Sequence, residues 1–240
     1  QQRERRGLRA RGCPADHLDA AVVVGLAVVA DQGELHVLER VDLLDARAAE
    51  RVEAAEVARE QHRRPPLAAN QIAVDRVVKE GDRIEVDEGV ALEVLETPGH
   101  SDCSLSFYDA ARRVLIISDA TGYYVPQHDT WWPNYFTDYG AYVRSIERLA
   151  ALDAEVLCLS HNAVIRGADD VRDYFRRALE VTRAYHERIV ADARAGKPTE
   201  EIAAALGAEV YQKTQLMPPD FFVKNCGLLV KISLKHAGIA

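Results

Sequence analysis

LETPGHSDCSLSFY, residues 95–108, places a Thr-Pro-Gly-His turn between two runs of alternating residues. The run before the turn, ALEVLE at 91–96, alternates small or apolar residues with charged ones, and CSLSFY at 103–108 alternates again. A period of two is typical of β-strands. We therefore expect His100 at a strand-to-strand corner, where scaffolds commonly display chemistry. Taken alone, His100 could also be an ordinary surface-loop histidine.

The residues around this corner predict a meander of short strands. RVVKEGDRIEVDEGVALEVLE at 76–96 predicts three strands separated by EGD and DEG turns, and SLSFYDAARRVLIISD at 104–119 predicts two strands around a DAARR turn. The aromatic-rich segment YYVPQHDTWWPNYF at 123–136 is expected to be a loop. Such a loop either forms part of a substrate wall or packs under the next helix.

Helical periodicity dominates the rest of the chain. YGAYVRSIERLAAL at 139–152 predicts a helix with Thr137 and Asp138 as possible caps, and AEVLCLSHN at 154–162 predicts a buried strand. Residues 168–196 predict a long amphipathic helix that Gly196 ends. PTEEIAAALG at 198–207 predicts a second, short helix, and FFVKNCGLLVKISLKH at 221–236 predicts a closing helix or strand.

Composition sets the first 68 residues apart. All sixteen aromatic residues lie at or after Phe107, and residues 1–68 contain arginine but no lysine. RAAERVEAAEVAREQHRR at 47–64 is typical of a highly charged helix with a thin apolar stripe. We expect a single domain over 1–240, with a poorly specified segment at 1–68, a strand-rich half at 69–167, and C-terminal helices with a closing segment at 168–240.

Charge and hydropathy narrow the function classes. The formal net charge of −8, with a basic cluster only in QQRERRGLRAR at 1–11, argues against nucleic-acid binding. The longest apolar stretch, AAVVVGLAVVA at 20–30, is about half as long as a bilayer crossing requires. The four cysteines lie far apart in the sequence, which is typical of thiols in a reducing compartment. They are Cys13, Cys103, Cys158 and Cys226. We therefore expect a cytoplasmic protein that acts on a small molecule, and the oligomeric state stays open.

Three polar corners share one structural position, because each follows an apolar strand. They are VLETPGH ending at His100, VLIISD ending at Asp119, and EVLCLSH ending at His161. Imidazole and carboxylate at the same ends of neighbouring strands can converge on one metal ion, such as zinc or iron. Each residue also has a simpler interpretation: Asp119 could cap a turn, and His161 could hydrogen-bond a strand end.

Taken together, TPGHS at 97–101, ISDA at 117–120 and LSHN at 159–162 resemble the ordered motifs of the metallo-β-lactamase superfamily of metal-dependent hydrolases. The resemblance implies an α/β (α+β) fold, the αββα sandwich. It implies that His100 binds a first metal, that Asp119 bridges two metals and orients the water, and that His161 binds the second metal. One or two zinc ions are implied, with iron or manganese as alternatives.

The superfamily's H-x-H-x-D-H motif is matched only in part. GCPADHLD at 12–19 offers Asp16 and His17 for its D-H end, as a catalytic aspartate and two further metal ligands, but Gly12 and Pro14 stand where the two earlier histidines belong. Few residues precede this segment, so we expect the N-terminal half-sheet to be truncated or altered.

Two functions follow from the resemblance. In the first, a metal-bound hydroxide attacks an ester, thioester, lactone or amide-type bond of a small substrate. In the second, the chain is a non-catalytic, degenerate or truncated member that lacks a complete metal site. The replaced motif histidines favour the second function, whereas the retained corners at His100, Asp119 and His161 favour the first.

Overall fold

The structure is a computed structural model that describes residues 7–10, 28–31, 34–37, 74–87, 89–161, 163–215 and 217–239. The chain divides into two units, residues 1–78 and 79–240. In the first unit, β1 (Gly7–Ala10) pairs in parallel with β4 (Val74–Val78), and β2 (Val28–Asp31) pairs antiparallel with β3 (Glu34–Val37). The expected helix at 47–64 lies outside the described residues.

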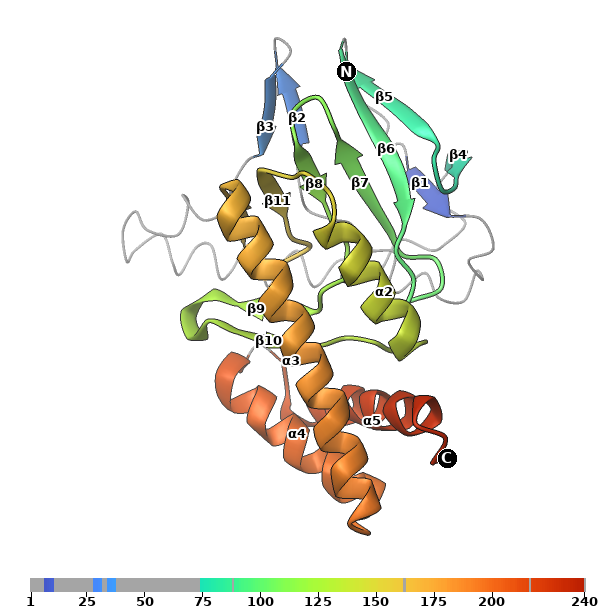
Figure 1. The fold of residues 1–240 in the computed structure, drawn as a ribbon, viewed down its shortest axis with the longest axis vertical. Helices are drawn as coiled ribbons and strands as arrows, with labels where there is room; N and C mark the ends of the chain where they lie inside the picture. The colour runs from blue at the N-terminus through green and yellow to red at the C-terminus, as the bar shows by residue number, and fades with distance from the viewer. Residues whose placement is uncertain are drawn as a thin grey trace. The chain divides into compact units, whose positions relative to one another are not determined.

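A six-stranded sheet forms the centre of the second unit (Figure 1). The order of its strands across the sheet is β12-β11-β8-β7-β6-β5. Their bounds are Arg83–Asp87 for β5, Val90–Glu96 for β6, Leu105–Asp109 for β7, Val114–Ile116 for β8, Val156–Cys158 for β11 and Val164–Arg166 for β12. The predicted alternation is confirmed on β6, where Val90, Leu92 and Val94 are buried while Glu93 is exposed.

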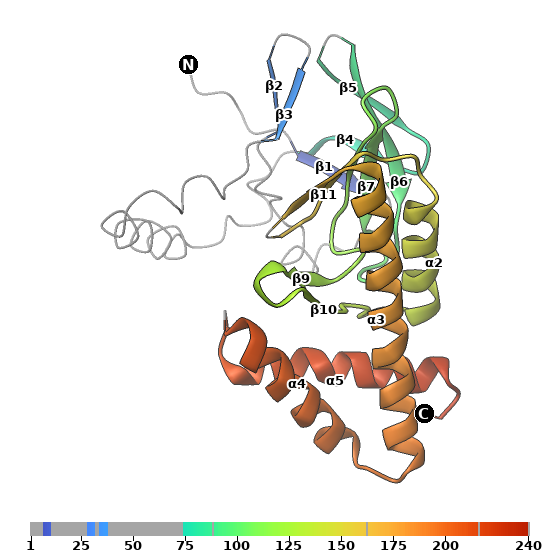
Figure 2. The ribbon, with the colours of Figure 1, turned by 60° about the vertical axis from the view of Figure 1, so that its left-hand side comes forward.

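The first two helices of the second unit, α2 (Tyr139–Ala150) and α3 (Ala168–Arg194), lie along the same face of this sheet (Figures 1 and 2). The predicted start of α2 is confirmed, because the Asp138 side chain accepts a hydrogen bond from the Ala141 amide at 2.6 Å. Apolar side chains of the sheet and both helices share one core. This sheet and its helix layer correspond to one half of the expected αββα sandwich, and the mixed α/β class is confirmed.

The long helix α3 ends as predicted, because Gly196 follows it with a φ of +83° that favours glycine. The short helix predicted at 198–207 is wrong in length, because α4 runs from Thr199 to Thr214. Gly207 does not stop α4. A Cβ at Gly207 would lie 2.8 Å from the backbone of Val223, so this glycine lets α4 approach α5 (Pro219–His236). The closing segment is thus a helix.

The aromatic-rich segment is not a plain loop. It forms a hairpin in which β9 (Tyr123–Val125) pairs antiparallel with β10 (Thr130–Trp132), joined by the 3₁₀ turn η3 (Pro126–His128). Asp129 completes the turn at a φ of +45°, in the left-handed region that aspartate tolerates. Tyr and Trp are frequent in strands, and their pairing across the hairpin overrides the turn signals that suggested a loop.

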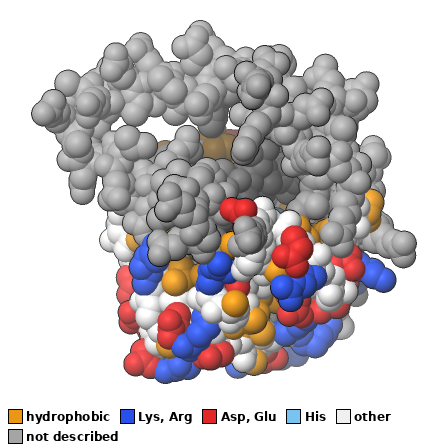
Figure 3. Space-filling model, turned by 90° about the horizontal axis from the view of Figure 1, so that it is seen from above, with side chains coloured by type: hydrophobic (Ala, Val, Ile, Leu, Met, Phe, Trp, Pro, Cys, Tyr) orange, Lys and Arg blue, Asp and Glu red, His pale blue; other side chains and the backbone are white. Residues whose placement is uncertain are grey.

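The surface of the second unit mixes charges of both signs. Figure 3 shows a face on which Lys and Arg side chains are interspersed with Asp and Glu. Arg188 on α3 pairs with Glu209 on α4 at 2.6 Å, one of several exposed ion pairs that each stabilise a fold by no more than about 1 kcal/mol. None of the helices in the described part of the chain is both long and apolar enough to span a membrane.

Candidate metal centre

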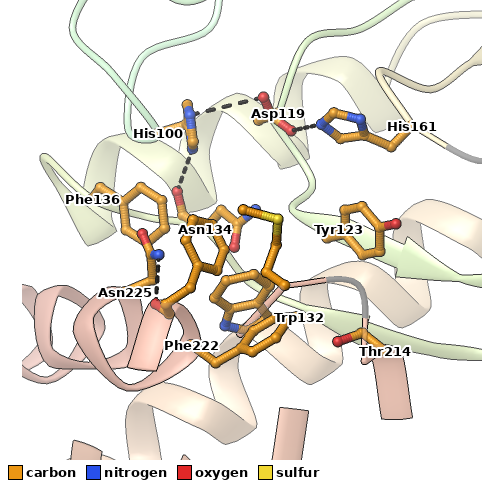
Figure 4. A pocket seen from close by; sticks show the side chains of 12 residues that line it. His100, Asp119, Tyr123, Trp132, Asn134, Phe136, His161, Thr214, Phe222 and Asn225 are labelled. Carbon is orange, nitrogen blue, oxygen red and sulfur yellow. Dashed lines mark hydrogen bonds and ion pairs between the residues drawn. The ribbon is translucent and has the colours of Figure 1, made fainter. Parts of the chain in front are cut away.

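Strand direction brings the three polar corners to one edge of the sheet. β7 runs antiparallel to both β6 and β8, and β11 runs parallel to β8. The strands β6, β8 and β11 therefore run in the same direction and end at the same edge. His100, Asp119 and His161 follow these ends and point toward one another, with Asp119 between the two imidazoles (Figure 4).

His100 is oriented by the turn that carries it and by a backbone carbonyl. Its Nδ1 lies 2.8 Å from the carbonyl oxygen of Asn134. A carbonyl can only accept a hydrogen bond, so Nδ1 carries a proton and Nε2 points into the site. Nε2 lies 3.8 Å from Oδ2 of Asp119, which is too long for a hydrogen bond. An imidazole nitrogen and a carboxylate oxygen thus face each other across a gap in which both could bind a cation.

Asp119 is the buried centre of the group, with only 6% of its surface exposed. Its Oδ1 accepts a hydrogen bond from the Ser160 hydroxyl at 3.1 Å and lies 3.2 Å from Nε2 of His161. Burial by itself raises the pKa of Asp119, but the interactions with His161 and His100 outweigh it, so the pKa lies below the ordinary aspartate value. The carboxylate is therefore available as an anionic ligand.

His161 completes the group from the opposite side. Its side chain is 39% exposed, and its ring packs against Tyr123 of the hairpin with 5.3 Å between the ring centroids. His100 has a similar aromatic support, because its ring lies 5.1 Å from that of Phe136. Aromatic side chains thus border both histidines.

The donor types fit a metal ion, although the described ligands do not complete a site. Imidazole nitrogen and carboxylate oxygen bind zinc, iron and manganese. In the ranges that the structure describes, no three His, Cys, Asp or Glu side chains are already arranged to hold an ion. The expected ligands Asp16 and His17 lie outside the described residues, as do Gly12 and Pro14.

A pocket opens beside this group, and part of its wall was not predicted from the sequence (Figure 4). The hairpin segment contributes Tyr123, Trp132, Asn134 and Phe136, whereas Trp131 and Tyr135 of the same segment are buried in the core. The segment therefore lines the pocket with some of its residues and packs into the core with others, and its role as a substrate wall stays a prediction. His128 is exposed and is not among the described residues of the wall.

The α4–α5 hairpin supplies the unpredicted side of the pocket. Its contributors are Thr214, Met217, Phe221, Phe222 and Asn225. The aromatic pair FF at 221–222 beside the Pro-Pro step at 218–219 was the available signal. A hydrophobic pattern on one helix does not say which distant segment it meets, so this wall required the three-dimensional structure.

Fold and site define a mixed α/β protein with histidine and aspartate donors at the C-terminal ends of sheet strands. The family model of the metallo-beta-lactamase superfamily matches residues 16–161. The chain belongs to the metallo-beta-lactamase superfamily.

The chain is also similar to solved structures, and it spans less than two thirds of the length of each of the three described here. A metallo-beta-lactamase family protein from Thermus thermophilus is 23% identical, with a TM-score of 0.47 over 78% of this chain and 60% of its own length. A beta-lactamase domain protein from Burkholderia ambifaria is 21% identical, with a TM-score of 0.46 over 77% of this chain and 55% of its own. A stereoselective inverting sec-alkylsulfatase from Pseudomonas sp. is 19% identical, with a TM-score of 0.47 over 70% of this chain and 27% of its own.

Proposed function

We propose that the chain is a metal-dependent hydrolase that cleaves an ester, thioester, lactone or amide-type bond of a small substrate. The observation that carries the proposal is the convergence of His100, Asp119 and His161 at one sheet edge, with Nε2 of His100 facing the Asp119 carboxylate. Membership of a superfamily that includes hydrolases supports the same conclusion.

Each residue has a distinct role in this proposal. His100 and His161 would hold the metal through Nε2, and Asp119 would hold it through its carboxylate. The Asn134 carbonyl fixes the His100 ring, and the Ser160 hydroxyl fixes the Asp119 carboxylate. A bound metal ion supplies Lewis acidity toward the oxygen of the scissile bond and lowers the pKa of water to about 7. Zinc is the proposed ion, with iron or manganese as alternatives.

Asp16 and His17 are proposed to supply the remaining ligands. A catalytic zinc ion is normally held by three protein ligands arranged around it, and a second ion needs more. The free thiols of Cys103 and Cys226 support a reducing, cytoplasmic location.

The alternative function is that of a non-catalytic member of the superfamily. Gly12 and Pro14 favour it, because neither side chain can bind a metal. This alternative predicts a folded chain that retains no metal and hydrolyses none of the substrate classes named above.

Metal content per chain, measured by elemental analysis after purification without chelators, tests the proposal. We expect about one or two ions per chain, lost in His161→Ala but retained in His128→Ala, since His128 is an exposed histidine away from the site. His17→Ala should lower the metal content if residues 16–17 complete the site. Metal at background level in a folded chain, or equal retention in His161→Ala, would refute the proposed site.

A further inference from the structure

The pocket beside the metal centre has a polar end and an apolar body. His100, Asp119 and His161 lie at one end, and the α4–α5 hairpin closes the other (Figure 4). The cavity volume is about 260 Å³, close to the lower end of the range for small-molecule sites, about 300–1,000 Å³. A cavity of this size has room for one ring or a short branched chain beside the bond to be cleaved.

The charge of the described wall is confined to the metal end. Asp119 is the only permanently charged residue among the described residues of the wall, and no lysine or arginine is among them. The polar groups farther along it, on Thr214 and Asn225, are neutral. The Asn225 amide nitrogen already donates to the Phe221 carbonyl of its own helix at 2.8 Å. An anionic group in the body of the pocket would lose its hydration without gaining a cationic partner, which is costly.

Two apolar side chains at the α4–α5 end of the pocket have much of their surface exposed to solvent. Met217 is 46% exposed and Phe221 is 37% exposed, whereas Phe222 and Trp132 beneath them are buried. Met217 precedes Pro218 and Pro219, which restrict the backbone of this turn. Large apolar side chains held open at the edge of a cavity favour an apolar ligand that covers them.

We propose that this pocket binds an uncharged aromatic acyl group, and that it selects neutral aryl-acyl substrates over short or anionic ones. This assignment of substrate class rests on the proposed hydrolase function. Trp132, Phe136 and Phe222 supply ring faces against which an aryl group stacks, and Met217 and Phe221 close over its outer edge.

Esters with one leaving group test the selectivity of the metal-loaded protein. The series is p-nitrophenyl acetate, p-nitrophenyl phenylacetate, and the anionic p-nitrophenyl hemisuccinate. We expect kcat/KM for the phenylacetate to exceed that for the acetate by at least about tenfold, because a well-filled apolar pocket discriminates by this order. The hemisuccinate should fall below the acetate. Equal values across the series, or a preference for the hemisuccinate, would overturn the proposal.

Two variants of α5 locate the effect. Phe221→Ser should lower the ratio of kcat/KM for the phenylacetate to kcat/KM for the acetate by at least about threefold. Leu228→Ser is the matched control, because Leu228 lies on the same helix, is 41% exposed and is not among the described residues of the pocket wall. A ratio unaffected by Phe221→Ser, or affected equally by Leu228→Ser, would contradict the assignment.

Binding of phenylacetamide to the metal-free protein separates this proposal from the hydrolase function. Tryptophan fluorescence reports the titration, since Trp132 lies in the wall. We expect saturable binding that Phe221→Ser weakens and Leu228→Ser does not, and weaker binding of 4-carboxyphenylacetamide. If no ester is hydrolysed but this pattern appears, the hydrolase proposal fails and the aryl pocket stands. If metal-dependent hydrolysis occurs without this pattern, only the pocket assignment fails.

Discussion

Replacing Gly99 in the Thr-Pro-Gly-His turn should destabilise the protein more than replacing any open glycine. Gly99 has a φ of +127°, and a Cβ at this position would lie 2.4 Å from both Cα and N of Tyr142 on α2. Those atoms are helix backbone and cannot rotate away. The Gly99 carbonyl also accepts hydrogen bonds from the amides of Thr137 and Asp138, so the turn and the start of α2 are tied together.

The expected loss of unfolding free energy for Gly99→Ala has two parts. The positive φ costs a side chain about 1–2 kcal/mol, and forcing a methyl group into a closed contact costs about 1–3 kcal/mol. Gly81→Ala is the matched control, because Gly81 has a φ of +76° with nothing within 4 Å of its added Cβ. It should show only the first part. The φ of +127° at Gly99 lies farther from the left-handed region than that of Gly81, so the two losses should differ by at least about 1–3 kcal/mol, the cost of the contact with α2.

Urea denaturation of the metal-free protein measures both losses, provided that the slopes of the two variants agree. Gly99→Ala should in addition lower the metal content, because the turn carries His100, whereas Gly81→Ala should retain it. Losses that agree within about 0.5 kcal/mol for the two variants would refute the contact argument.

Three further predictions concern stability. Tyr135→Phe should lower the unfolding free energy by about 1–2 kcal/mol, because it leaves the buried hydroxyl of Ser233, 2.9 Å away, without its partner; the double variant with Ser233→Ala should recover part of the loss in urea denaturation. Burial lowers the pKa of His186, so the unfolded chain takes up a proton first and the unfolding free energy should fall as pH drops through about 6.5. His186→Gln should make the melting temperature depend less on pH in this range. An unchanged pH dependence of the melting temperature would contradict this prediction. Arg148 holds the pKa of Glu80 below its ordinary value, so the stabilisation by this half-exposed pair should be fully present above the unfolded pKa of about 4.3 and should be lost as pH falls through the folded value. Glu80→Gln should therefore cost less than about 1 kcal/mol at pH 7 and nothing near pH 2, measured by urea denaturation.

Local patterns predicted the parts of the fold that depend on neighbouring residues. Alternation located β6 and β7, and the cap at Asp138 and the stop at Gly196 fixed helix ends. The predicted end of the short helix at Gly207 was wrong, because a glycine that ends a helix and a glycine that admits a second helix look alike in sequence. The difference lies in Val223, sixteen positions along the chain, whose backbone occupies the space.

Local sequence patterns also predicted the three residues of the candidate site, but they did not predict the pocket beside it. The local strand pattern is enough to predict a polar corner after each of the three strands. The common direction of β6, β8 and β11 then brings these corners together. The wall from α4 and α5 depends on packing between segments about 90 residues apart, as in the contact of Trp132 with Phe222. Periodicity indicates which face of a helix is buried but does not identify the segment that covers it.

The orientation of His100 depends on the helix packing as much as on the turn. Tyr142, fully buried on α2, leaves room only for glycine at position 99, and its hydroxyl accepts a hydrogen bond from the Asn134 amide at 3.4 Å. The carbonyl of Asn134 in turn accepts the proton of His100 Nδ1. One residue of α2 therefore positions both the turn that carries the imidazole and the carbonyl that directs its lone pair. Metal binding and the contact between Gly99 and Tyr142 both favour the same folded geometry, so they should be coupled. The free energy by which a bound metal stabilises the contact should then equal the free energy of metal binding that is lost when the contact is damaged.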